Sequence, residues 1–342
     1  MTDSDATDPA PCPDRRRAIA RLGGLGTRAV ASALGLSTAA RAEGPPPRLL
    51  VGFPAGGTID AVARLLAAAW RTRFASPPLV EQRVGAGGRI AVVALKEAAP
   101  DGLTLLLSPA SIFTIYPHVY RRLPYDPATD VQPVTPVCDY VCGLGVGPLV
   151  PEAVKTLADF VAWVRANPRL GAYGSPAAGA MPHFLGTQFA RAAGIELTHV
   201  PYRGAVPGLQ ELMGGQIAAG LFALGDFLPQ LAGGRLRLLA VADGHRSRHA
   251  PSVPTFAEQG YPALRGVESF GLFLPARAPA GAATQLFELT RVAMADPAVI
   301  EGLTRLGLQP AAREPAAYAH QLAAERGRWA PVVRASGFMA DD

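Results

Sequence analysis

The sequence predicts an α/β protein of two doubly wound lobes around a ligand cleft. Strand patterns alternate with amphipathic helix patterns along most of the chain, which is typical of parallel sheets covered by helices. The alternation forms two series, one complete by Ser108 and one that begins at Thr156. A chain of 342 residues with 49% hydrophobic content is long enough for two such lobes.

The first series has the order β-α-β-α-β. Its strands are expected at residues 47–53, 77–83 and 103–108, each with a short run of Leu or Val. Between them, residues 60–74 show apolar residues at helical spacing, and residues 89–102 read as a helix closed by a Pro-Asp-Gly turn.

The second series continues this alternation and is followed by a late strand and two helices. Its expected helices are 156–168, 181–194, 205–215 and 225–234, and its expected strands are 170–176, 197–202, 216–224 and 235–242. A further strand is expected at 267–275, with helices at 279–294 and 315–335. We predict lobe 1 from residues 43–146 plus 269–342 and lobe 2 from residues 147–268.

Residues 1–42 are predicted to be an export signal. Arg15, Arg16 and Arg17 precede a weakly apolar Ala/Leu/Gly stretch, and Ala40 and Ala42 form a small-x-small cleavage site. The Arg cluster and low hydrophobicity favour the twin-arginine route over the general one. The alternative is a cytoplasmic disordered leader. Beyond residue 42, no apolar run approaches the roughly 20 residues of a membrane span.

The two cysteines beyond the leader, Cys138 and Cys142, lie in a segment expected to be a strand. Positions four apart in a strand are separated by about 13 Å, which exceeds disulfide reach. We expect two buried free thiols. No His lies near enough in sequence to suggest a metal pair, so neither a metal nor a cofactor is expected.

The charge pattern argues against nucleic acid. The net charge is +5, and the Arg residues are scattered and form no run with interleaved aromatics.

Three loops rich in small residues follow expected strands, where parallel sheets bind ligands. In the first, "FPAGGTID", Gly56 and Gly57 allow close approach to backbone amides, and the helix beginning near Thr58 favours an anion. Asp60 is interpreted as a first-turn capping residue, with direct ligand contact as the alternative. A phosphate site is disfavoured because no P-loop Lys follows.

The second loop, "GSPAAGAMPH", offers Ser175 and the amides near Gly179 and Ala180. His183 is interpreted as a packing residue, because no nucleophile with an acidic partner accompanies it. The third loop, "VPYRGAVPG", offers Tyr202 and the guanidinium of Arg203, which suits a carboxylate; a solvated surface Arg is the alternative.

The segments "VGFPAGGTIDAVARLLA", "VEQRVGAGGRIAVVALKEAAPDGLTLLL", "LPYDPATDVQPV", "HVPYRGAVPGLQELMGGQI", "GGRLRLLAV", "PSVPTFAEQGYP" and "SFGLFLPARAP" occur in this order. In order and spacing they resemble the substrate-binding proteins of tripartite tricarboxylate transporters, the Bug family. The resemblance runs from about Pro46 to Gly337.

The resemblance implies a periplasmic solute-binding protein with two Rossmann-like lobes, similar to type II periplasmic binding proteins. Such a receptor binds a small mono- or dicarboxylic acid and delivers it to membrane permease subunits; the alternative is a receptor that reports to a sensor kinase. A monomer is expected. The first loop would bind one carboxylate through amides and water, and the other two loops would bind the other end. The implied ligand-binding residues are Phe53, Ala55, Gly56, Gly57, Thr58, Asp60, Ser108, Ser111, Ser175, Gly179, Ala180, His183, Tyr202, Arg203, Gly204 and Ala205.

Departures from the family pattern make the expected site more apolar. Two acidic positions of the family fall here on Ala218 and on Phe222 or Ala223, and small polar residues are replaced by Pro109, Ala110 and Ile112. The sequence therefore favours a ligand with an apolar or aromatic body and at least one carboxylate. Catalysis is not expected, because the loops offer mostly Gly, Ala and Ser without a convergent acid, base or nucleophile.

Overall fold

The structure is a computed structural model that describes residues 45–340. The expected export signal, residues 1–42, and the cleavage site near Ala42 lie outside the described residues. Within residues 45–340, no helix is both long and apolar enough to cross a membrane.

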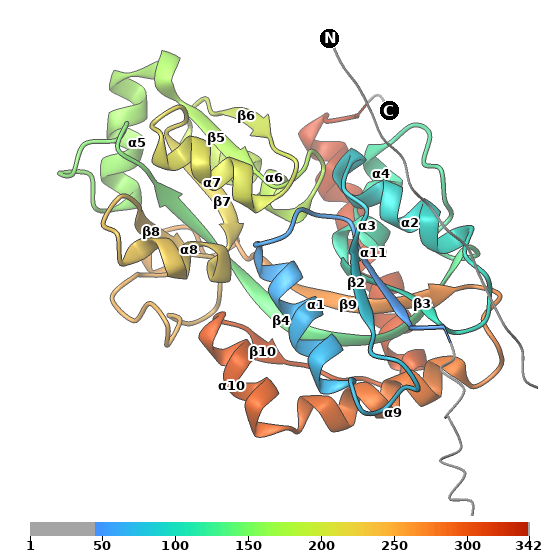
Figure 1. Ribbon diagram of the computed structural model, residues 1–342. Helices are drawn as coiled ribbons and strands as arrows, with labels where there is room; N and C mark the ends of the chain where they lie inside the picture. Colours follow the sequence, from blue (N-terminus) through green and yellow to red (C-terminus); the bar gives the residue numbers. More distant parts are fainter. Residues whose placement is uncertain (1–44, 341–342) are drawn as a thin grey trace, which may run out of the picture. The chain divides into compact units, whose positions relative to one another are not determined.

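The strands form one mixed sheet, in which two groups of strands share a long central strand. Their bounds are β1 Arg48–Val51, β2 Leu79–Gln82, β3 Thr104–Pro109, β4 Val131–Val146, β5 Ala172–Ser175, β6 Thr198–Pro201, β7 Ala219–Ala223, β8 Arg237–Val241, β9 Val267–Pro275 and β10 Gln309–Pro310. The main path is β2-β1-β3-β9-β4-β7-β5-β6, and both β8 and β10 also pair with β4. Figure 1 shows β4 as one long strand common to both groups.

Strand β4 changes partners in its middle. Residues 131–141 pair with β9, whereas Cys142–Val146 pair with β7 on one side and residues 143–146 pair with β8 on the other. At the same point, the Cys142 amide donates to the carbonyl of Gly266, which immediately precedes β9. Two neighbouring segments therefore connect the β1-containing group, called group 1, to the β5-containing group, called group 2.

The parallel pairing expected from the sequence is found in both groups, but the strands at the centre of the sheet are antiparallel. Strands β1, β2 and β3 pair in parallel, as do β5, β6 and β7. By contrast, β9 and β4 are antiparallel to each other, β9 is antiparallel to β3, and β4 is antiparallel to β7. A long strand that passes from one group to the other is no part of a local β-α-β repeat, so the alternating pattern does not reveal its direction.

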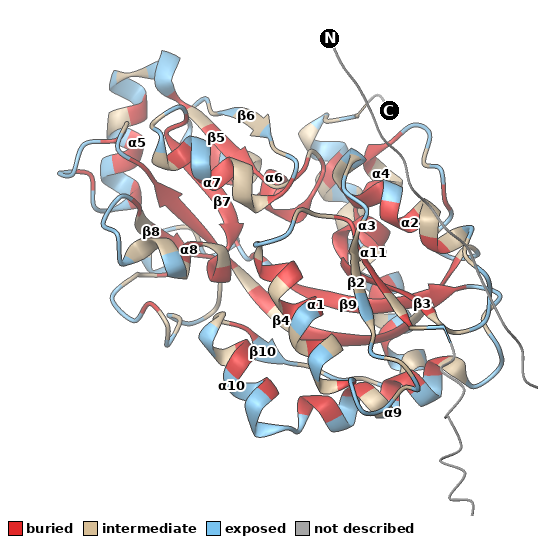
Figure 2. Ribbon diagram, viewed as in Figure 1, coloured by how far each residue is buried: buried red, intermediate tan, exposed pale blue. Residues whose placement is uncertain are grey.

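Helices cover both groups. Their bounds are α1 Thr58–Ala69, α2 Arg89–Lys96, α3 Ser111–Thr114, α4 Tyr116–Val119, α5 Leu157–Ala166, α6 Met181–Ala193, α7 Ala205–Met213, α8 Leu224–Leu231, α9 Ala282–Met294, α10 Pro297–Arg305 and α11 Pro315–Ser336, with short 3₁₀ turns at Ala86–Gly88, Pro168–Leu170 and Ala257–Gln259. Figure 2 shows the strands largely buried, while α5, α9 and α10 expose their outer faces.

Sequence analysis overlooked α10, although its start carries a recognisable signal. The Asp296 side chain accepts a hydrogen bond from the Ala298 amide, and Pro297 is the first helical residue. An acidic N-cap followed by Pro is a known start signal for a helix. The prediction of two buried free thiols in a strand is confirmed, since Cys138 and Cys142 are both buried in β4.

Candidate functional site

A cavity of about 60 Å³ lies where groups 1 and 2 meet. Group 1 contributes the loop before α1, the residues after β3, and side chains of β4 and β9; group 2 contributes residues after β5 and β7 and the start of α7. The lining residues are Phe53, Pro54, Gly57, Thr58, Ile59, Pro109, Ser111, Ile112, Tyr116, Tyr140, Pro176, Ala180, Pro182, Ala205, Val206, Ala223, Asp226 and Phe270.

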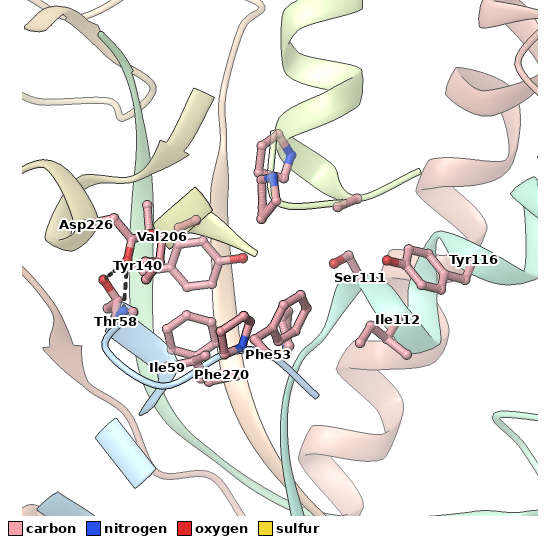
Figure 3. Close-up of a pocket in the computed structure, with 18 residues that line it drawn as sticks. Phe53, Thr58, Ile59, Ser111, Ile112, Tyr116, Tyr140, Val206, Asp226 and Phe270 are labelled. Carbon is pink, nitrogen blue, oxygen red and sulfur yellow. Dashed lines mark hydrogen bonds between the residues drawn. The ribbon is translucent and has the colours of Figure 1, made fainter. Parts of the chain in front are cut away.

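Most of this lining is apolar. Aromatic and aliphatic side chains such as Phe53, Ile59 and Phe270 lie along one side of the space in Figure 3. The hydroxyl groups of Tyr140 and Ser111 point into the same space from opposite sides. A concave, mainly apolar pocket with a few converging polar groups is the usual form of a small-molecule site.

The start of α1 faces this cavity, as the sequence predicted. Two of the backbone amides there already donate hydrogen bonds to side chains of the protein. The Thr58 amide donates to Oδ1 of Asp226 at 2.8 Å, and the Thr58 hydroxyl donates to the same oxygen at 2.6 Å. The Gly56 amide donates to Oδ2 of Asp60 at 3.0 Å. Two amides expected to meet a ligand anion therefore donate to carboxylates of the chain itself.

Asp60 holds the loop from within the helix. Its carboxylate also accepts hydrogen bonds from Arg64 at 3.0 Å and from the Gln82 amide at 2.7 Å. These donors outweigh the effect of burial and lower the pKa of Asp60. Asp60 is buried and does not line the cavity. This geometry agrees with the capping interpretation.

Asp226 is the third residue of α8 and comes from group 2, whereas Thr58 comes from group 1. Burial raises the pKa of Asp226, and the two Thr58 donors oppose that effect. The positive end of α1 points at this carboxylate, which favours its charged form. The Thr58–Asp226 pair thus joins the two groups at the edge of the cavity.

Glu268 lies behind the cavity and positions two of its polar residues. One carboxylate oxygen accepts the Ser111 amide at 2.5 Å, and the other accepts the Tyr140 hydroxyl at 2.6 Å. Burial raises the pKa of Glu268 to about 7. The Tyr140 ring stacks on Phe270, with ring centroids 4.3 Å apart. The Ser111 hydroxyl also bonds the Glu268 carboxylate, and these hydrogen bonds oppose the effect of burial on the pKa of Glu268.

Two histidines, His183 of α6 and His199 of β6, form hydrogen bonds with the second loop. The Ser175 hydroxyl donates to the Ala177 carbonyl at 3.0 Å, so the Nε2–H of His199 donates to the Ser175 oxygen at 2.7 Å. The Gly179 amide donates to Nδ1 of His183 at 3.0 Å. The two imidazole rings stack with centroids 3.8 Å apart.

Both imidazoles are neutral at neutral pH. Burial lowers the pKa of His183 to about 4. Burial, together with the neighbouring His183, lowers the pKa of His199 to about 3. Because the Ser175 proton points at a carbonyl, His199 is not placed to deprotonate the hydroxyl, as a nucleophile–base pair would require.

The third loop contributes its backbone rather than its charged side chain. Arg203 is exposed and does not line the cavity. Tyr202 packs partly buried against a satellite core in group 2. Gly204 has a φ of 104°, and a Cβ there would lie 2.7 Å from Cδ of Pro54. The loop therefore approaches the first loop so closely that only Gly fits at residue 204.

The cavity brings together about a third of the residues that the sequence implied. Those on its wall are Phe53, Gly57, Thr58, Ser111, Ala180 and Ala205. Those not on its wall are Ala55, Gly56, Asp60, Ser108, Ser175, Gly179, His183, Tyr202, Arg203 and Gly204. Sequence analysis missed Tyr140, Phe270 and Asp226, whose positions depend on β4, β9 and the start of α8.

Contacts away from the cavity wall also join the two groups in this structure. The Tyr120 hydroxyl of group 1 donates to the Ala178 carbonyl of group 2 at 3.2 Å. A Cβ on Gly179 would lie 2.8 Å from Cγ1 of Val119. Among residues 45–340, no cluster of His, Cys, Asp or Glu has the arrangement of a metal site.

Comparison with known proteins matches this chain to a family of transport receptors. The model of the "Tripartite tricarboxylate transporter family receptor" matches residues 62–338. Protein BugT of Bordetella pertussis is 32% identical over 293 residues, which cover 85% of this chain and 89% of BugT.

Two solved structures resemble the described fold closely. R. palustris Rpa4515 with adipate has a TM-score of 0.82 and 30% identity, covering 87% of this chain and 98% of that chain. MatC (Rpa3494) from Rhodopseudomonas palustris with bound malate has a TM-score of 0.78 and 27% identity, covering 84% and 98%. The α/β fold of periplasmic binding proteins, expected from the sequence, is confirmed.

Proposed function

Because the chain belongs to the tripartite tricarboxylate transporter receptor family, we propose that it captures a small carboxylate in the cavity between groups 1 and 2. It is a periplasmic solute-binding receptor by family. The finer proposal is that it delivers its ligand to the membrane permease of a tripartite transporter. Adipate and malate in the related structures support a carboxylate as the ligand class.

The observation that carries this proposal is the cavity itself, which has one wall from each group and is bridged by Thr58 and Asp226. A site of this kind forms only when the groups approach each other. Binding would therefore be coupled to closure of lobe 1, residues 43–146 plus 269–342, on lobe 2, residues 147–268. The change of partners at Cys142 in β4 and the bond to Gly266 support a hinge at these two segments.

The proposal includes export and the absence of catalysis. The mature chain would begin near Glu43, after the small-x-small site. Neither the cavity nor the Ser175–His199 pair supplies a nucleophile with a placed base, which supports binding without turnover.

A thermal-shift screen with mono- and dicarboxylic acids tests the proposed function. A ligand that binds only the folded chain at roughly 100 times its Kd stabilises it by about 2.7 kcal/mol. We expect at least one acid to raise the melting temperature and to remain chemically unchanged after incubation. No shift with any acid at millimolar concentration, or turnover of a bound acid, would contradict the proposal.

A further inference from the structure

Glu268 is a buried carboxylate that lies between two cavities. On one side it bonds Ser111 and Tyr140, which line the cavity between groups 1 and 2. On the other side it lines a second cavity of about 490 Å³ beside α11, called the rear cavity. Arg265 and Arg328 also line the rear cavity, and both are exposed, so solvent reaches this side of Glu268. A proton can therefore reach Glu268 without crossing the ligand cavity.

Glu268 uses both hydroxyl donors of the ligand cavity wall beside it. One carboxylate oxygen accepts the Ser111 amide at 2.5 Å and the other accepts the Tyr140 hydroxyl at 2.6 Å, while the Ser111 hydroxyl also bonds the carboxylate. An ionised carboxylate only accepts hydrogen bonds, so both hydroxyl protons are directed at it. While Glu268 is charged, a ligand carboxylate beside Ser111 would find neither hydroxyl as a donor and would be repelled by a like charge.

A proton on Glu268 reverses this arrangement. The neutral carboxyl group is itself a donor, so it donates to the oxygen of either the Ser111 or the Tyr140 hydroxyl. The hydroxyl that accepts this bond no longer gives its own proton to Glu268 and can turn that proton into the cavity. One donor thus appears on the wall as one negative charge disappears from behind it. A ligand carboxylate is the acceptor that forms the stronger, charged hydrogen bond with this donor.

The surroundings of Glu268 favour proton uptake when another anion approaches. No cation pairs with Glu268 among residues 45–340. Arg313 pairs with Asp139 at 3.5 Å. Arg328 pairs with Glu325 at 3.7 Å. Burial raises the pKa of Glu268 to about 7, and a ligand carboxylate nearby would raise this pKa further. The other titratable or charged groups around Glu268 are Arg265 before β9, Tyr140 and Cys142 of β4, Tyr116 of α4, Tyr318 of α11 and, beyond Tyr140, Asp226 of α8.

Asp226 is less suited to take up the proton. Its Oδ1 accepts both the amide and the hydroxyl of Thr58, and the positive end of α1 favours its charged form. Glu268 has no such helix end as a partner and has the like charge of Glu325 nearby.

We propose that Glu268 is a proton-binding residue of this receptor, and that the cavity takes up a carboxylate together with one proton. This inference rests on the proposed function, namely that the cavity binds a carboxylate. It deepens that function by assigning the donor: a hydroxyl of Ser111 or Tyr140 is released to the ligand when Glu268 is neutral. Acid affinity then rises as pH falls through the range in which Glu268 titrates.

Calorimetry in two buffers counts the protons. Hexanoate, benzoate and adipate are the probes, and at about pH 8 the carboxyl groups of all three are ionised. The stacked imidazoles of His183 and His199 are neutral at this pH, because burial lowers the pKa of each. Titration of the purified protein in buffers with different ionisation enthalpies should show uptake of close to one proton for each molecule of at least one acid bound.

The pH profile of the wild type distinguishes a proton on Glu268 from a proton on the ligand. With Glu268 as the acceptor, Kd should be constant below about pH 7 and should rise above it by up to about tenfold per pH unit, the limit for one linked proton. A ligand bound as the neutral acid would instead keep gaining affinity down to its own pKa, at roughly 4 to 5.

Glu268→Gln is the neutral counterpart, because its amide group both donates and accepts, as a protonated carboxyl group does. It should bind the same acid without proton uptake and with a Kd that is independent of pH. The matched control is Asp139→Asn. It removes a carboxylate that also lines the rear cavity and whose pKa is also raised by burial, but that bonds no residue of the ligand cavity wall. This variant should keep the uptake of close to one proton.

Acid binding without proton uptake in the wild type would overturn the inference while the proposed function stands. Uptake that persists in Glu268→Gln would also overturn it, because the proton would then lie on the ligand or on Asp226. Absence of binding by all three probes at every pH would overturn both. If Glu268→Gln fails to fold, the presence or absence of the break near pH 7 in the wild-type profile decides the inference.

Discussion

The loop before α1, residues 52–57, and the loop before α6, residues 176–180, are both rich in small residues but differ in chemistry. Each follows a strand of a parallel set, is rich in small residues and leads into a helix. In the first, amides donate to the carboxylates of Asp60 and Asp226. In the second, the Gly179 amide donates to the neutral imidazole of His183.

The difference shows that a Gly-rich turn into a helix indicates where donors are, but not which acceptor uses them. The acceptors come from the same helix in the case of Asp60 and His183, and from a distant helix in the case of Asp226. Beside the first loop, the cavity wall therefore carries the carboxylate of Asp226, which comes from α8. The second presents an uncharged, mostly apolar wall made by Pro176, Ala180 and Pro182.

The largest expected effect is that of Gly57→Val in the first loop. Gly57 has an extended backbone with φ of −85°, which any residue adopts, so the substitution should cost little stability. A Cβ at this position would lie 3.7 Å from Oδ1 of Asp226 and 3.9 Å from Cγ2 of Val206, so the added methyl groups should fill the cavity. Calorimetry should detect no acid binding.

The matched control for Gly57→Val is Gly233→Val, at an exposed position after α8 where an added Cβ would meet the Gln230 carbonyl oxygen at 3.6 Å, an ordinary van der Waals contact. Unchanged acid affinity in Gly57→Val, with a normal melting temperature, would show that ligands bind away from the first loop.

Two buried groups outside the cavity wall should make the folding stability depend on pH in opposite directions, and the first of them is Glu268. Its pKa of about 7 in the folded chain exceeds the usual 4.5, so the native state binds more protons between these values. Stability should therefore fall as pH rises from 4.5 to 7, by roughly 3 kcal/mol from this group. Denaturant titrations of Glu268→Gln, which retains an acceptor and a donor, should lack this loss. Parallel pH curves for both proteins would contradict the assignment.

His183 should contribute with the opposite sign. Its pKa of about 4 in the folded chain lies below the usual 6.5, so the unfolded state takes up a proton first as pH falls. Stability from this group is present above pH 6.5 and is lost, by roughly 3 kcal/mol, as pH falls toward 4. In His183→Asn, which keeps an acceptor near the Gly179 amide, acid unfolding should be shallower. If the stability of the variant fell as steeply with decreasing pH as that of the wild type, His183 would not be the neutral group responsible.

Two serine substitutions compare the cavity with the second loop, and their expected effects on affinity and stability are smaller. Ser111→Ala removes a hydroxyl on the cavity wall that bonds Glu268, so it should reduce both stability and acid affinity, each by roughly 1 kcal/mol, the usual net value of one hydrogen bond. Ser175→Ala removes a buried hydroxyl that bonds Ala177 and His199, so it should reduce stability and leave affinity unchanged. Calorimetry and thermal melting of both variants test this; reversed effects would exchange the roles of the two loops.

The smallest effect is expected for Arg203→Ala. The side chain is exposed and off the cavity wall, so acid affinity should change by less than about twofold. A large loss by calorimetry, and a larger one for adipate than for adipamate, would instead assign Arg203 to the second carboxylate.

Local sequence patterns correctly predicted those cavity residues that lie in a loop and at the start of the helix that follows it. A strand, a glycine pair and a helix start are contiguous, so the placement of Gly57 and Thr58 could be predicted, as could Ala205 at the start of α7. Arg203 shows the limit of this reasoning: its position beside the site was visible in the sequence, but the direction of its side chain depends on packing.

The remaining residues depend on distant contacts. Asp226 is 168 positions from Thr58, and no local pattern marks it as the acceptor for that amide. Tyr140 and Phe270 meet because β4 and β9 pair as antiparallel strands, a pairing that the alternating strand and helix pattern did not anticipate. Pairing between strands over such separations is set by the whole fold rather than by local preference.

A crystal structure with the acid that gives the largest thermal shift tests the central claim most directly. We predict that the acid lies in the cavity between groups 1 and 2, in contact with Phe53 and Phe270 on one side and with residues of group 2 on the other. An acid bound outside this cavity would contradict the claim.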